Sequence, residues 1–187
     1  ISLIFVLPHF ADAAQASLSL SPKDGTYTLG NTFSVGVILD TGGVSVNAVE
    51  GKIRYPIEDL AIIGVSTEGS PITSWTTSPD TTSEKGLVSF GGINPEGMIE
   101  KGKQLFSITF RVVRSGETRI RIASGAAILS EGGAGTNILT DLRGGTYTLS
   151  NNDVRTEALR NGPSILRSSS HPDEAAWYGS PDVLFEW

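Results

Sequence analysis

The sequence of 187 residues has no cysteine and only two histidines, and these absences exclude several kinds of chemistry. Without thiols the chain cannot form a disulfide framework, a zinc–thiolate centre or a cysteine nucleophile. The histidines, His9 and His171, lie outside the stretch 15–150. No Ser-His-Asp set can therefore be assembled within that stretch.

Long basic and long apolar runs are also missing. The net charge is −6 and no cluster of basic residues exists to neutralise phosphates, which argues against nucleic acid as a partner. The apolar stretch Ile1–Leu7 is too short to span a bilayer as it stands. We expect any membrane contact to come only through an anchor outside this sequence.

Acidic residues are present, but they are dispersed. Two paired carboxylates could hydrolyse a glycoside. The acidic residues fall in predicted turns or on outward strand positions, however, where ordinary solvated acids explain them, so we predict that the protein is not an enzyme. The loop aspartates Asp40, Asp80 and Asp141 form no dense ligand cluster, and we predict no metal and no cofactor.

What the sequence has in abundance is alternation. In Gln104–Val113, Phe106, Ile108, Phe110 and Val112 fall on one face, and polar residues fall on the other. A period of two indicates a half-buried β-strand. Burying four such side chains contributes roughly 6–12 kcal/mol, at about 1.5–3 kcal/mol each. This face needs partner strands and an opposing sheet.

Similar short strands recur along the chain, separated by glycine-rich turns. We predict about nine of them, at 17–20, 33–39, 46–55, 60–65, near Trp75, 87–91, 104–113, 118–123 and 145–149, with a further brief run at 126–129. Leu60–Val65 is almost wholly apolar and is expected to be covered on both faces, whereas Gly91–Gly97 is expected to be a loop. The pattern predicts an all-β protein, an antiparallel β-sandwich of jelly-roll or immunoglobulin-like type.

The composition changes at both ends of this predicted domain. Residues 1–14 end in small residues spaced A-x-A, typical of the remnant of a secretory signal peptide; a buried first strand is the alternative. Residues 15–150 form the β-sandwich domain. Residues 151–187 begin as a polar linker and become rich in aromatics, which indicates either the start of a further β-domain or a disordered tail.

Several stretches share their order and spacing with a known family. They are Phe33–Leu39, Asn47–Pro56, Gly86–Phe90, Leu105–Val113 and Gly132–Asn137. Through these stretches, residues 16–150 resemble the cohesin domain, a member of the carbohydrate-binding-module-like sandwich superfamily. The resemblance implies a nine-stranded jelly roll that binds a dockerin module through one flat sheet face.

The resemblance also implies a set of partner-binding residues on that face. Such a module is non-catalytic, belongs to a secreted or cell-surface protein, and is linked to polysaccharide binding or degradation. The residues that the resemblance assigns to the face are Asn47, Glu50, Lys52, Arg54, Leu87 and Ser89. A plain solvated sheet face would show the same alternation of charges.

Two further functions remain open. A carbohydrate-binding module would stack a sugar ring on an exposed aromatic side chain, and Trp75 is the candidate because it sits in a polar stretch. The same ring could instead cap the edge of the sandwich. A structural spacer in a surface stalk would bind neither protein nor polysaccharide.

Overall fold

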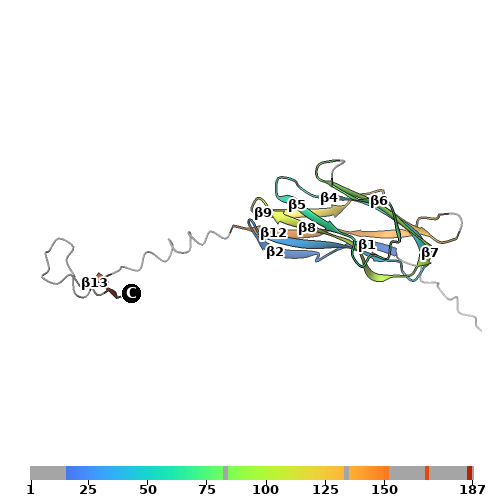
Figure 1. Ribbon diagram of the computed structural model, residues 1–187, viewed down its shortest axis with the longest axis horizontal. Helices are drawn as coiled ribbons and strands as arrows, with labels where there is room; N and C mark the ends of the chain where they lie inside the picture. Colours follow the sequence, from blue (N-terminus) through green and yellow to red (C-terminus); the bar gives the residue numbers. More distant parts are fainter. Residues whose placement is uncertain (1–15, 82–83, 133–134, 152–166, 169–184, 187) are drawn as a thin grey trace, which may run out of the picture. The chain divides into compact units, whose positions relative to one another are not determined.

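We describe the fold from a computed structural model, which describes residues 16–81, 84–132, 135–151, 167–168 and 185–186. The predicted signal-peptide remnant over residues 1–14 lies outside these residues. The elements of the described chain are all β-strands (Figure 1). No helix in the described ranges is long and apolar enough to cross a membrane. The predicted all-β class is confirmed.

One sheet has five strands in the order β11-β1-β3-β8-β5. Their bounds are β1 (Ala16–Ser21), β3 (Thr32–Asp40), β5 (Leu60–Ser66), β8 (Lys101–Val112) and β11 (Leu139–Arg143). Strands β3 and β8 pair so that apolar residues face each other: Phe33 lies opposite Phe110, and Val35 opposite Ile108. The register is set by the apolar pattern, because a slip of one residue would turn every one of these side chains to solvent.

The second sheet has seven strands in the order β2-β12-β9-β4-β7-β6, with β10 also paired to β4. Their bounds are β2 (Asp24–Thr28), β4 (Val46–Arg54), β6 (Ser74–Asp80), β7 (Leu87–Met98), β9 (Gly116–Ile122), β10 (Ala127–Ser130) and β12 (Gly145–Ser150). In Figure 1 the strands of these two sheets run roughly along a common direction. That arrangement is typical of an aligned β-sandwich.

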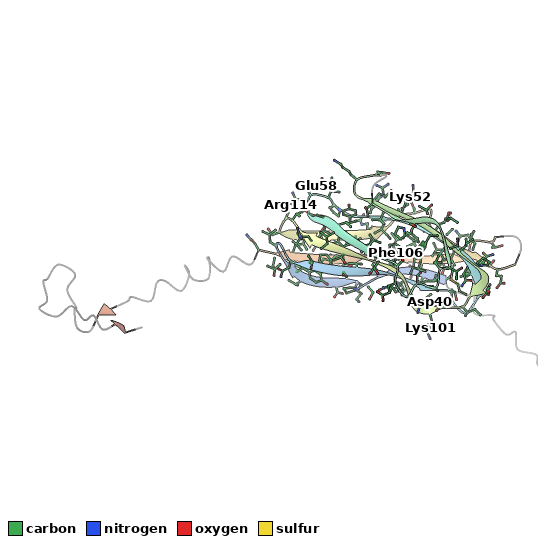
Figure 2. The ribbon with its side chains drawn as sticks, in the orientation of Figure 1. Asp40, Lys52, Glu58, Lys101, Phe106 and Arg114 are labelled. Atoms are coloured by element: carbon green, nitrogen blue, oxygen red, sulfur yellow. The ribbon has the colours of Figure 1, made fainter. Side chains whose placement is uncertain are left out.

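The core lies between the two sheets and is centred on β8. The four residues predicted to point inward from this strand are each at most 1% exposed: Phe106, Ile108, Phe110 and Val112. Phe106 reaches Phe90 of the opposite sheet, with ring centroids 4.9 Å apart. Figure 2 shows Phe106 in the interior of the sandwich. The predicted central strand is therefore confirmed.

Two short edge strands extend the predicted set. Strand β11 pairs with β1, and β2 pairs with β12, and both pairings are parallel. The remaining neighbours in the two sheets are antiparallel. The parallel pairs arise at the sheet edges, where long connections bring distant segments alongside.

Two local predictions were wrong. Gly91–Gly97 is not a loop, because β7 continues to Met98. At Gly91 and Gly92 the backbone lies so close to Thr76 and Ile72 that a β-carbon would collide with them, so glycine serves close packing here. Leu60–Val65 is not covered on both faces, because β5 is an edge strand whose register shifts at Ile63, and this side chain is 48% exposed.

The chain divides into two compact units after Asn151. In the second unit the structure describes only β13 (Arg167–Ser168) and β14 (Phe185–Glu186), which pair antiparallel. The prediction of a further β-domain or a disordered tail falls largely outside the described residues.

Removing the ring of Phe106 should destabilise the fold strongly. We expect Phe106→Ala to lower the free energy of unfolding by about 3–5 kcal/mol. The substitution removes the contacts of the ring with both sheets and leaves a cavity between them. Urea denaturation measures this difference. Lys103→Ala, at an exposed position of the same strand, should change stability by less than about 0.5 kcal/mol. Equal effects of the two substitutions would contradict the placement of the core.

Stability should also fall at high pH because of Tyr147. This residue is fully buried and its hydroxyl donates to the carbonyl of Pro22 at 2.7 Å. Burial, reinforced by nearby Tyr27 and Asp24, raises the pKa of Tyr147 well above its ordinary value. The unfolded chain loses this proton near pH 10 while the folded protein keeps it. The free energy of unfolding should therefore decrease as pH rises above about 10.

Chemical denaturation at a series of pH values measures this decrease. Tyr147→Phe should be less stable at neutral pH, by about 1–3 kcal/mol, because the Pro22 carbonyl loses its partner. Its stability should also depend less on pH above 10. An unchanged pH slope in this variant would show that Tyr147 is not the group responsible.

Candidate docking face

The outward surface of β4 carries the predicted charged residues. Alternation turns Val49 and Ile53 into the core, where each is at most 2% exposed. Glu50 and Lys52 lie between these two residues, Arg54 follows Ile53, and all three are exposed. Figure 2 shows Lys52 at the rim of the molecule, away from the interior position of Phe106. The predicted alternation on β4 is therefore present in the structure.

Strand β7 brings its own residues alongside. Lys52 lies opposite Ser89, and Glu50 lies opposite Gly91. Ser89 is half-buried and Gly91 has no side chain, so this part of the surface is flat around the charged side chains of β4. We define the outer side of β9, β4 and β7 as the docking face.

Leu87 does not contribute to this face as expected. It lies opposite Arg54, at the start of β7, but it is only 4% exposed. The preceding turn is closed by hydrogen bonds from Leu87 N to Glu84 O at 3.2 Å and from Tyr55 N to Gly86 O at 3.0 Å. An apolar side chain gains free energy from burial, so Leu87 is withdrawn from solvent and is unavailable for contact.

Asn47 lies toward the other end of β4. Against β10 the register shifts between Ala48 and Val46, which leaves Asn47 as the extra residue of a β-bulge, and its side chain is half-buried. Arg54 lies seven positions further along the strand, roughly 23 Å away at about 3.3 Å per residue. The predicted residues thus form an elongated stripe, and no compact pocket gathers them.

Strand β9 adds two cations that the resemblance did not assign to the site. Arg54 lies directly opposite Arg121, and Arg119 follows on the same side of β9. Their outward direction could be predicted from alternation. Their position beside β4 could not, because it depends on pairing between segments about 70 residues apart.

The docking face ends in a cleft at the carboxyl end of β4. Its volume is about 530 Å³. It is lined by Arg54, Tyr55, Pro56, Ile57, Glu58, Lys85, Gly86, Arg119 and Arg121. Lys85 was not among the predicted site residues; it comes from the turn before β7.

Trp75 lies on a different side of the second sheet. Its partner on β7 is Gly92, which lies opposite the core residue Val49 on β4, so Trp75 is on the core-facing side. The ring is half-buried and packs edge-on against Phe106, with centroids 6.2 Å apart. This packing agrees with a side chain that caps the sandwich edge.

Other aromatic rings of the described chain are also engaged with one another. Tyr27 stacks on Phe33 at 3.9 Å, and Tyr55 packs against Phe110 at 5.4 Å. Within the described ranges, no group of three or more His, Asp or Glu side chains is placed to hold a metal ion. The docking face can therefore contact a partner through charged side chains on a flat sheet surface, and not through a stacked aromatic ring.

Comparison with known proteins identifies the architecture. The structure is similar to a type I cohesin–dockerin complex from Clostridium thermocellum, Coh-OlpA-Doc918, with a TM-score of 0.58 and 15% sequence identity, over 73% of this chain and 99% of that chain. It is also similar to a non-cellulosomal cohesin from the archaeon Archaeoglobus fulgidus, with a TM-score of 0.56 and 16% identity, over 77% and 97%. The chain has the cohesin fold.

A third solved structure with the cohesin fold belongs to an enzyme-associated module. It is the cohesin module from a Clostridium perfringens family 33 glycoside hydrolase, with a TM-score of 0.53 and 12% identity, over 73% of this chain and 96% of that chain. No protein-family model and no curated protein matches the sequence. The cohesin fold that the sequence resemblance predicted is therefore confirmed by the similar solved structures.

Truncating Trp75 should cost stability, because its ring packs on the core of the cohesin fold. We expect Trp75→Ala to lower the free energy of unfolding by about 1–3 kcal/mol, since the ring is only half-buried. Thermal and urea denaturation measure the change. Thr77→Ala, at an exposed position of the same strand, is the control. If Trp75→Ala were as stable as this control, the ring would be free to contact a ligand.

Proposed function

We propose that this protein is a non-catalytic, cohesin-like docking module that binds a dockerin-like protein partner through the docking face. The observation that carries the proposal is the exposed row Glu50, Lys52 and Arg54 on a flat outer sheet surface of a cohesin fold. Such a surface offers direct contacts over a wide area, as protein interfaces require.

The comparisons support a protein partner. The similar structure from Clostridium thermocellum is a cohesin–dockerin complex. The described part of this chain also has no aromatic platform on the docking face that would favour polysaccharide. The prediction of sugar stacking on Trp75 loses support because that ring packs against Phe106.

We further propose that the module works outside the cytoplasm, in a protein linked to polysaccharide binding or degradation. The apolar stretch that resembles a signal-peptide remnant supports the location. The occurrence of a similar module in a glycoside hydrolase supports the link to polysaccharides.

Binding to a panel of recombinant dockerin modules tests the proposed function. We expect Lys52→Glu to weaken binding at least about tenfold, because it reverses a charge in the middle of the docking face. Ser89→Arg should weaken binding by adding a long side chain beside Lys52. Isothermal titration calorimetry measures both effects.

The matched control for charge is Lys103→Glu, which makes the same change on the five-stranded sheet. It should leave the affinity within about twofold of the parent protein. An equal loss of binding in this variant, or an unchanged affinity in Lys52→Glu and Ser89→Arg, would reject the docking face. A glycan array run in parallel would reveal polysaccharide binding instead.

A further inference from the structure

The cleft at the carboxyl end of β4 concentrates positive charge in an acidic protein. Four cationic side chains line it, Arg54, Lys85, Arg119 and Arg121, against the single carboxylate of Glu58. The chain as a whole has a net charge of −6. The charge of this part of the surface is therefore opposite in sign to the net charge of the protein.

Folding alone gives no reason for this arrangement. Arg54 and Arg121 lie directly opposite each other on neighbouring strands. Like charges at such positions destabilise a sheet. The cost would be removed by a negatively charged group placed between or above the two guanidinium groups.

The protein itself does little to neutralise the cleft. The ion pairs within the described ranges join Arg119 to Glu117, Arg114 to Asp59 and Arg143 to Asp141. Only the first involves a residue of the cleft, at 3.2 Å between two exposed side chains. Among the described residues, no carboxylate forms an ion pair with Arg54, Lys85 or Arg121 within 4.0 Å.

The rest of the lining indicates which anion would fit. All four cations are exposed and come from three separate segments, so they do not converge as buried donors would around a small anion. The ring of Tyr55 packs against Phe110 of the core and is not free to stack on a sugar. Ile57 is 45% exposed and offers an apolar contact at the same cleft.

We infer that the cleft receives an acidic segment of the protein partner, whose Asp or Glu side chains pair with Arg54, Arg121 and Lys85 while an apolar residue contacts Ile57. The inference rests on the proposed docking function and names the chemistry of the partner's contact surface. Opposite charges at this site speed association and fix the orientation of the partner on the docking face.

A synthetic peptide tests this inference without knowledge of the natural partner. The probe is a fluorescein-labelled, helix-forming peptide with Glu and Leu side chains on one face, titrated with the full chain at 50 mM NaCl. We expect binding by fluorescence anisotropy, and a steep loss of affinity at 500 mM NaCl, because exposed charge pairs are screened by salt. The same peptide with Lys in place of Glu should not bind.

Matched variants locate the binding site. Arg54→Gln with Arg121→Gln should weaken peptide binding about tenfold, as expected for the loss of two exposed charge pairs. Lys103→Gln with Arg111→Gln, which removes the same number of charges from the five-stranded sheet, should leave it within about twofold. Thermal melting checks that both variants are folded.

Several results would overturn the inference: no binding of the Glu peptide, equal binding by the two double variants, or binding of polygalacturonate through the same cations in the absence of peptide binding. A dockerin module that is sensitive to Lys52→Glu but insensitive to the Arg54 and Arg121 substitutions would also overturn it, and would leave the proposed function standing. Peptide binding through the cleft, with no dockerin bound, would support the cleft and reject the dockerin-like partner.

Discussion

The packing of β8 against the opposite sheet is the constraint on which the rest of the structure depends. Strand β8 lies between β3 and β5, so its apolar side is supported on both flanks. From there Phe106 contacts Phe90, and Phe110 contacts Phe33 and Tyr55. These rings join both sheets through one central strand, and their burial supplies a large part of the hydrophobic free energy of folding.

Because the inner faces are committed to this core, only the outer faces of the two sheets are open to contact, and the two differ in chemistry. The five-stranded sheet presents small hydroxyl side chains, such as Ser34, whose hydroxyl lies 2.9 Å from that of Thr109, together with the exposed cations Lys103 and Arg111 on β8. The second sheet presents long charged side chains on β4 and β9. Long charged groups in a row on a rigid sheet can select a partner by charge.

The distribution of charge adds a second level to this difference. Acidic residues predominate in the chain, yet the end of the docking face is basic. The adjacent positions of Arg54 and Arg121 carry an electrostatic cost in the free protein. A binding surface that is slightly unfavourable alone, and relieved by a partner, is a common way in which specificity is achieved at the expense of stability.

Much of the strand pattern and the inward faces could be predicted, because the period of two along a strand is a local property that each segment carries by itself. The alternation in Gln104–Val113 and Val46–Tyr55 thus placed Phe106 inside and Lys52 outside. The prediction of a loop over Gly91–Gly97 was wrong because glycine occurs both in turns and where two segments pack closely. Only the residues that lie beside these glycines in the fold distinguish the two cases.

The position of one strand beside another is a long-range property, and only the tertiary structure decided it. Pairing of β9 with β4 places Arg121 beside Arg54. Packing buries Leu87, although it lies opposite Arg54, and pairing of β6 with β7 turns Trp75 toward Phe106. Each of these depends on contacts between separate segments, which are selected by the whole core and not by the pattern of one segment. The amino-acid sequence therefore determined the alternation along each strand, and the fold decided which residues meet and which outward residues, such as Leu87, are covered.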